Sequence, residues 1–476
     1  MSERSKWVGR AFIFIIFVAS GGFSPAMTKA APGSDALLAL KQGLDPVFST
    51  RAGVAADQAW HAAEYGACAK AFDEIARGAK DQFSRITARF RAGRCHERGG
   101  AYEKAAQAYK EVRAVRALLA PLAALRLSVM RHEQGRVDEA LRFALEASKD
   151  SVLRKRAEGF RARILEAAGR DRVLVKEFEK ARALDLKLKI ARAHLRLGNE
   201  RQANDVLRSL VRRDPLGSVG KEARSILAEK DSDCFVGEAN YSCFSTREIL
   251  EVGHSLYRAH ASTTIVDLIE PRLSEPGFQE PGIACEATLL VARSYTKLRN
   301  RKKSLPHYVR AQPLCRERKQ EPDVLYFGGV DAYREDRLEQ ALNSFRRLHE
   351  GWPKHSYNDD AILYEAAAIE AQGNRARADK LIRKSLDTYP GGDMRSQLGW
   401  RYVWSSLRLS KEKEALSRVR EIKKLLPAAK GYKGKGRLDY WEARLLERRG
   451  KRKEAIAGYL EVLREAPLSF HALLSF

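Results

Sequence analysis

Six cysteines provide the covalent chemistry that the sequence indicates most directly. They fall into three pairs along the chain: Cys68 with Cys95, Cys234 with Cys243, and Cys285 with Cys315. The sequence contains no CxxC motif and no Cys/His cluster with zinc spacing, which disfavours metal binding and thioredoxin-type exchange. Cys285 lies near the start of one expected helix and Cys315 near the end of the next, and antiparallel packing would bring those ends together. The spacing therefore predicts structural disulfides, with buried free thiols as the alternative.

A glycine- and lysine-rich run is the second group of residues that could bind a ligand. The run KGYKGKGR, residues 430–437, lacks the GxxxxGK[ST] spacing of a phosphate-binding loop. The favoured interpretation is a flexible basic loop between two helices. The alternative is a polyanion contact through Lys430, Lys433, Lys435 and Arg437.

Three His-Glu dipeptides and one pair of acids resemble parts of catalytic or metal sites. The dipeptides begin at His96, His132 and His349, and none continues as HExxH, so we expect solvated histidines near helix ends. Asp359 and Asp360 follow Ser356 and Asn358, either of which could cap a helix whose first turn holds both acids. We therefore predict no catalytic residue, no cofactor site and no metal site in this chain.

Four tryptophans could contact a ligand through their rings. Most of them are expected in the core, and the alternative is that they line a groove. They are Trp352, Trp400, Trp404 and Trp441.

The elements that must position these residues are paired helices. The tetratricopeptide pattern has a Gly that ends the first helix, an Ala five residues later where two helices cross, and a Pro that breaks the second helix twelve residues after the Ala. The last four such alanines are Ala341, Ala378, Ala415 and Ala455. Pro353, Pro390, Pro427 and Pro467 follow with identical spacing. The repeats predict an all-α fold, an α-α superhelix of tetratricopeptide-like type.

In an earlier copy of the repeat, either of two glycines could occupy the Gly position of the pattern. Before Ala105, Gly99 stands six residues away and Gly100 five residues away. Between the Gly, Ala and Pro positions of the repeat, helix-forming residues dominate, and the alternation of apolar and polar residues that is typical of strands is nearly absent.

Composition and the N-terminus restrict the compartment and the partner. The 476 residues carry a formal net charge of +26, which indicates an acidic partner. Residues 1–30 have a basic start, a short apolar run and small residues suited to cleavage, as in a secretory signal peptide; an uncleaved anchor is the alternative. Cleavage after Ala30 would remove a net +3 and leave +23. We expect a periplasmic protein with no transmembrane domain after signal cleavage and no nucleic-acid partner.

Turn-rich stretches divide the chain further. We predict a signal peptide at 1–30, a helical-repeat segment at 33–230, a disulfide-pinned loop at 231–245 and a second solenoid segment at 246–476. Ser245 or Thr246 is the expected cap of the helix that opens the last segment, with Glu248 near its start.

The C-terminal part resembles one enzyme family. Residues 440–474 contain Tyr-Trp-x-Ala-Arg, from Tyr440 to Arg444, and Pro-Leu-Ser-Phe, from Pro467 to Phe470. Together with Trp400 and the stretch from Trp352 to Ala367, these residues resemble the superhelical region of soluble lytic murein transglycosylases. The resemblance is clear from about residue 320 and plausible from 245.

The resemblance implies a role in the cell wall. Members of that family have a periplasmic α-superhelix followed by a lysozyme-like domain that cleaves the glycan strand of peptidoglycan with one Glu. The Glu-Ser and Gly-Leu-Met-Gln motifs of that domain do not occur in the 476 residues, so no catalytic residue is transferred. We therefore expect a noncatalytic superhelix, cut off before a C-terminal catalytic domain, that binds or guides peptidoglycan. The alternative is a stand-alone exported scaffold that binds envelope proteins.

Overall fold

The computed structural model describes residues 50–115, 118–230, 241–426 and 436–475. In those residues it contains 24 α-helices, two short 3-10 helices and no strand, which confirms the predicted all-α repeat fold. The chain divides into two compact units, unit 1 (Met1–Val206) and unit 2 (Leu207–Phe476), and α12 spans the division. The signal peptide predicted at 1–30 lies outside the described residues, and the boundaries predicted for the internal segments stay predictions.

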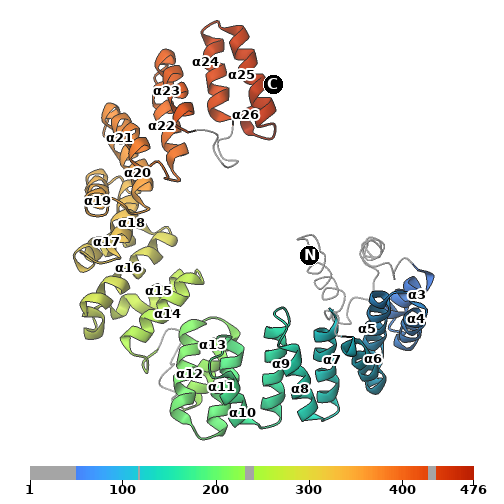
Figure 1. Cartoon of the computed structure of the whole chain (residues 1–476). Coiled ribbons are helices and arrows are strands. Elements are labelled where there is room, and N and C mark those ends of the chain that lie inside the picture. Colours follow the sequence, from blue (N-terminus) through green and yellow to red (C-terminus); the bar gives the residue numbers. More distant parts are fainter. Residues whose placement is uncertain (1–49, 116–117, 231–240, 427–435, 476) are drawn as a thin grey trace. The chain divides into compact units, whose positions relative to one another are not determined.

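Unit 1 is a series of helices in which sequence neighbours pack against each other (Figure 1). Its helices are α3 (Arg51–His61), α4 (Tyr65–Gly78), α5 (Gln82–Arg98), α6 (Tyr102–Ala114), α7 (Ala120–Glu133), α8 (Val137–Ala147), α9 (Arg154–Ala167), α10 (Asp171–Phe178), α11 (Leu184–Arg196) and the start of α12 (Glu200–Arg213).

Unit 2 is likewise built of helices that pack against their sequence neighbours. It contains α13 (Ser218–Lys230), α14 (Thr246–Arg258), α15 (Ser262–Ile269), η3 (Glu270–Ser274), η4 (Pro276–Gln279), α16 (Pro281–Lys297), α17 (Arg301–Leu314), α18 (Glu321–Arg334), α19 (Leu338–Gly351), α20 (Asn358–Ala371), α21 (Arg375–Thr388), α22 (Arg395–Leu407), α23 (Glu412–Leu425), α24 (Arg437–Arg448), α25 (Arg452–Glu465) and α26 (Phe470–Leu473).

The Ala and Gly residues of the repeat pattern lie where a small side chain or a positive φ is required. Ala341, Ala378 and Ala415 are fully buried, because each lies near the start of the second helix of a pair, where the two helices approach closely. Gly100 has φ +74° at the turn between α5 and α6, whereas Gly99 has a negative φ, so Gly100 is the residue that the turn requires.

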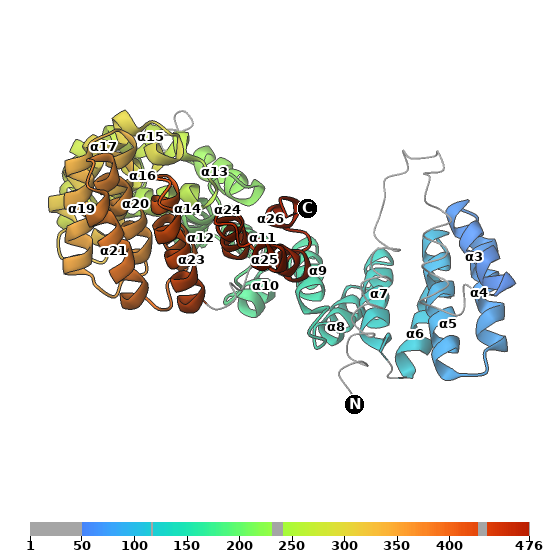
Figure 2. The same cartoon turned by 90° about the horizontal axis from the view of Figure 1, so that it is seen from above.

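The first helices of successive pairs in unit 2 lie against one another. In addition to the contacts within pairs, α14 contacts α16, α16 contacts α18, α18 contacts α20, and α20 contacts α22. Figure 2 shows α19 and α21 side by side, with α20 to one side of both. Side chains on neighbouring first helices can therefore combine into one surface.

The start of α14 has the cap that its sequence predicts. Ser245 is the N-cap residue, and its hydroxyl accepts from the backbone N–H of Glu248 while the Glu248 carboxylate accepts from the Ser245 N–H. Arg208 and Arg212 also bind the Glu248 carboxylate, and its pKa is lowered to about 2. Burial alone would raise that pKa, and the hydrogen bonds from Arg208 and Ser245 outweigh it.

Candidate ligand-binding face

Aromatic residues of unit 2 are concentrated on one set of helices. The six first helices α14, α16, α18, α20, α22 and α24 carry eleven aromatic residues. The six second helices α15, α17, α19, α21, α23 and α25 carry three. Most of the eleven are buried or pack against the apolar cores, so the rings that remain exposed are the candidates for ligand contact.

Three tryptophans on this face form a cluster, which we call the tryptophan cluster: Trp400, Trp404 and Trp441. Trp400 and Trp404 are four residues apart on α22 and therefore lie on the same side of the helix. Their ring centroids are 5.6 Å apart, and each lies 6.0 Å from the ring of Trp441 on α24. Trp404 remains 41% exposed. Core packing was the favoured expectation: Trp400 packs against the apolar core as predicted, and Trp404 departs from the expectation.

Arg437 belongs to this cluster rather than to a free basic loop. Its guanidinium lies 5.0 Å from the centroid of the Trp400 ring, a cation–π arrangement. Partial burial lowers the pKa of Arg437. The other three predicted polyanion contacts, Lys430, Lys433 and Lys435, lie outside the described residues.

A second aromatic group lies further back along the same face. The Tyr326 ring on α18 stacks on Tyr357 with centroids 4.6 Å apart, and Phe327 contacts Tyr357 edge-on at 5.6 Å. Arg293 on α16 lies 4.6 Å from the centroid of the Phe327 ring. Trp352, by contrast, packs beside the apolar core of α18, α19 and α20, as predicted.

Asp359 and Asp360 lie in the first turn of α20, as predicted, and Asp359 also connects this repeat to the next. The N-cap residue of α20 is Tyr357, without a side-chain cap, so the capping roles predicted for Ser356 and Asn358 are wrong. The Asn358 amide instead donates to the Trp352 carbonyl oxygen at 2.8 Å. Asp359 accepts from the backbone N–H of Met394, just before α22, at 2.9 Å.

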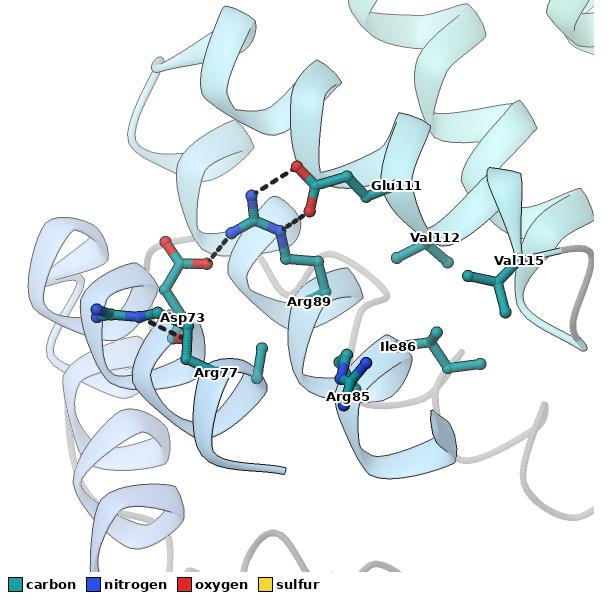
Figure 3. A pocket seen from close by; sticks show the side chains of 9 residues that line it. Asp73, Arg77, Arg85, Ile86, Arg89, Glu111, Val112 and Val115 are labelled. Atoms are coloured by element: carbon teal, nitrogen blue, oxygen red, sulfur yellow. Dashed lines mark hydrogen bonds and ion pairs between the residues drawn. The ribbon is translucent and has the colours of Figure 1, made fainter. Parts of the chain in front are cut away.

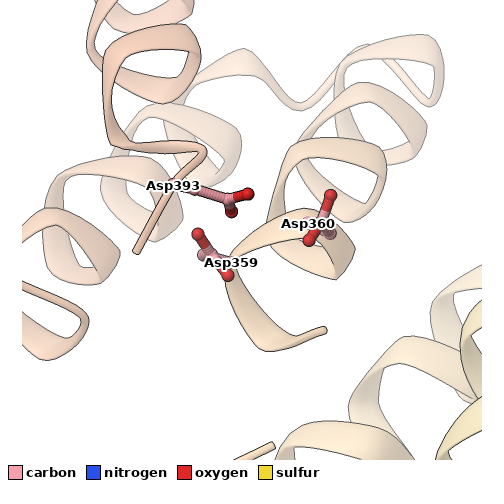
Figure 4. A group of neighbouring side chains, drawn as sticks. All are labelled: Asp359, Asp360 and Asp393. Atoms are coloured by element: carbon pink, nitrogen blue, oxygen red, sulfur yellow. The ribbon is translucent and has the colours of Figure 1, made fainter. Parts of the chain in front are cut away.

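Asp359, Asp360 and Asp393 are close neighbours (Figure 4). One carboxylate oxygen from each lies within 4.8 Å of the others. Burial first, and then the charges of Asp359 and Asp393, raise the pKa of Asp360 to about 6. Three acids at this distance repel one another at neutral pH, and hard cations are the ions that such oxygen sets bind. The sequence could not reveal this group, because Asp393 comes from the next repeat.

The three histidines of the His-Glu dipeptides are not solvated, contrary to expectation. The His349 ring binds the Glu365 carboxylate through Nε2 and the Asn358 amide oxygen through Nδ1, both at 2.9 Å. His96 lies 3.5 Å from the Asp73 carboxylate. His132 packs edge-on against Phe160. Their partners come from other turns or other helices, which HE dipeptides do not encode.

Two of the predicted cysteine pairs are at disulfide distance. The Cα atoms of Cys68 and Cys95 are 5.9 Å apart, and those of Cys285 and Cys315 are 5.0 Å apart. Both pairs join a helix near its start to the end of the next helix. The pair of Cys234 and Cys243 includes Cys234, which lies outside the described residues.

Unit 1 has a cavity of about 510 Å³ between α4, α5 and α6 (Figure 3). Arg89 is bound there by two carboxylates, at 2.5 Å from Asp73 and 2.6 Å from Glu111. The hydrogen bond with Glu111 is the largest factor that raises the pKa of Arg89, and it lowers that of Glu111. Arg89 is thus neutralised by two acids, while Arg77 and Arg85 line the same cavity.

Comparison with known proteins finds a family model and solved structures that are similar to parts of the chain. A model of the tetratricopeptide repeat family matches residues 87–115 and 185–216, which fall in α5–α6 and from α11 to just beyond α12. A tetratricopeptide repeat protein from Parabacteroides merdae is 13% identical, with 60% of this chain and 93% of that chain covered and a TM-score of 0.32. No curated protein matches the chain.

Within its described residues, the chain has no helix that is both long enough and apolar enough to cross a bilayer. The helix-pair architecture, the buried alanines at the crossings and the two family matches lead to one conclusion: this is a tetratricopeptide-like helical-repeat protein.

Proposed function

We propose that the chain is an exported, noncatalytic scaffold that binds peptidoglycan and presents its glycan strand to a lytic transglycosylase activity. The observation that carries the proposal is the tryptophan cluster on α22 and α24, with Trp404 41% exposed on the first-helix side of unit 2.

Exposed aromatic rings suit a glycan ligand. Sugar rings have apolar C–H faces that pack on indole rings, and the indole N–H can donate to a sugar hydroxyl. Arg437 beside Trp400 adds a cation, which suits a polymer whose peptide stems bear carboxylates. A scaffold of stacked pairs can hold such an extended ligand across several repeats.

The family resemblance supports the same site. Trp400, Tyr440 and Trp441 are among the residues that resemble the superhelix of lytic transglycosylases, and they are also members or neighbours of the tryptophan cluster.

Binding to purified sacculi tests the proposal. We expect the chain to co-sediment with sacculi and Trp404→Ala to weaken binding by roughly tenfold, because an aromatic contact contributes about 1–1.5 kcal/mol. Leu409→Ala is the matched control, since Leu409 is 47% exposed just after the same helix. Equal binding by wild type, Trp404→Ala and Leu409→Ala would contradict the proposal.

A second candidate is a stand-alone exported scaffold for envelope proteins. The tetratricopeptide matches at 87–115 and 185–216 favour it, because such repeats suggest protein–protein interaction. A protein partner that binds stoichiometrically, together with no binding to sacculi at low salt, would support this candidate over the first. A zymogram of the purified chain should show no lysis under either candidate.

A further inference from the structure

The cavity of unit 1 has an aliphatic wall and a cationic wall. It lies between α4, α5 and α6, and its volume of about 510 Å³ is in the range that holds small organic ligands. Ile86, Val112 and Val115 line it and lie together on one side in Figure 3, with Arg77 on the opposite side. Arg85 also lines the cavity. A ligand there can contact guanidinium groups and aliphatic side chains at the same time.

The charges of Arg77 and Arg85 are not neutralised by an acid in the described part of unit 1. Arg77 donates through Nε to the backbone carbonyl oxygen of Asp73 at 3.4 Å, and Arg85 donates through Nη2 to that of Ala79, also at 3.4 Å. Both bonds are long, and both acceptors are uncharged. Since both side chains are exposed, their remaining N–H groups can reach a ligand.

The position of Arg85 does not suit the helix that carries it. Arg85 comes four residues after Asp81, the N-cap of α5, and therefore lies near the positive end of the helix dipole, where a cation is disfavoured. Arg77 lies in the last turn of α4, where a cation is favourable. Helix stability thus accounts for Arg77 but not for Arg85. An anion in the cavity would offset the unfavourable charge of Arg85.

The two acids of the described lining are already occupied. Asp73 and Glu111 both bind Arg89. The lining therefore offers donors through Arg77 and Arg85, but no free carboxylate for the N–H groups of a peptide, which would lose their hydrogen bonds to water. A bare inorganic anion would leave the aliphatic wall without a contact. The combination favours a ligand that joins an anionic group to an aliphatic chain.

We propose that this cavity binds an aliphatic carboxylic acid. Its carboxylate would lie between Arg77 and Arg85, because a guanidinium binds the two oxygens of a carboxylate with parallel hydrogen bonds. Its chain would pack on Ile86, Val112 and Val115, where burial removes CH₂ groups from water. The site belongs to unit 1 alone, and its ligand is independent of peptidoglycan binding by the tryptophan cluster.

The test compares hexanoate with its amide, hexanamide, by isothermal titration calorimetry of the whole chain at low salt. The double variant Arg77→Gln/Arg85→Gln removes the proposed cations. The matched control is Lys70→Gln/Lys104→Gln, which removes one exposed charge from α4 and one from α6, neither of them in the cavity lining. Val115→Ser keeps every charge and shortens the aliphatic wall. Circular dichroism checks that all three variants fold.

We expect the wild type to bind hexanoate at one site, and hexanamide at least roughly tenfold more weakly. The arginine variant should lose roughly tenfold or more in hexanoate affinity, while the lysine control should bind like the wild type. Val115→Ser should bind hexanoate about threefold more weakly and acetate unchanged, because acetate is too short to reach the aliphatic wall. Higher salt should weaken hexanoate binding by the wild type.

Several outcomes would overturn the proposal. They are no hexanoate binding by the wild type, equal binding of hexanoate and hexanamide, unchanged binding by the arginine variant, or an equal loss in the lysine control. Tighter binding of inorganic phosphate than of hexanoate would show a site for bare anions, and tighter binding of N-acetyl-leucine would show a site for peptide ends; either result would contradict the assigned ligand. None of these probes contains a glycan, so the outcome does not depend on the proposed function.

Discussion

Removal of the Cys285–Cys315 disulfide should destabilise unit 2 locally by an amount that the structure allows us to work out. The two residues are 30 positions apart, and both are fully buried. Closure of a loop of that length lowers the entropy of the unfolded chain by about 12 cal/mol/K, which stabilises the folded state by about 3.6 kcal/mol at 25 °C. The double variant Cys285→Ala/Cys315→Ala should lose that amount.

The effect should be confined to the repeats that the bond joins. Cys285 lies near the start of α16, and Cys315 is the C-cap residue of α17. Since each helix pair contacts mainly its neighbours, the loss should be largest in α16, α17 and α18 and small in unit 1. Native-state hydrogen exchange measures it segment by segment.

A variant of the Cys68–Cys95 disulfide in unit 1 provides the comparison. Cys68→Ala/Cys95→Ala opens a loop of similar length, with a separation of 27, and should weaken α4 and α5 by nearly the same amount. A loss below about 1 kcal/mol in α16 and α17, or an equal loss in both units from either variant, would refute the reasoning.

Three further predictions concern packing and charge. Ala415→Leu should destabilise the α22–α23 pair by about 1–3 kcal/mol, because Ala415 is fully buried where the two helices cross. Denaturant unfolding measures the loss, with Lys413→Leu at an exposed position of the same helix as the control. Asp360→Asn should stabilise unit 2 at pH 8 by up to about 1 kcal/mol and progressively less towards pH 4. In the folded protein the pKa of Asp360 is about 6, above its ordinary value of 3.8, so the wild type loses stability as the pH rises through 6. Thermal unfolding at several pH values measures the stability difference between variant and wild type, and a difference that does not change with pH would contradict the prediction. Glu97→Gln should destabilise unit 1 by about 3 kcal/mol, because the largely buried Arg94 and Arg126 lose the carboxylate that they share. A loss under about 1 kcal/mol in urea unfolding would contradict this.

The repeat architecture could be predicted because its signals are local. A positive φ at Gly100 and a buried Ala378 depend on residues within one helix pair, so their spacing in the sequence is enough to identify them. Two cysteine pairs were predictable for the same reason, since each joins two consecutive helices.

The side-chain groups were less predictable because they form between repeats. Asp359 meets Met394 35 residues later, and Glu97 meets Arg126 29 residues later. Such partners depend on the stacking of one pair on the next, which the sequence of either pair does not specify. Trp404 was expected in the core for a related reason: a large apolar residue on a helix has the same spacing whether it packs inside or faces a ligand.

We propose that the first-helix side of unit 2 binds the glycan of peptidoglycan. Hydrogen exchange of the chain with and without soluble glycan strands tests it most directly. We predict slower exchange in α22 and α24, the helices that carry Trp400, Trp404 and Trp441, and unchanged exchange in α23 and α25. Unchanged exchange in α22 and α24 at saturating glycan, or protection of α23 and α25 instead, would contradict the claim.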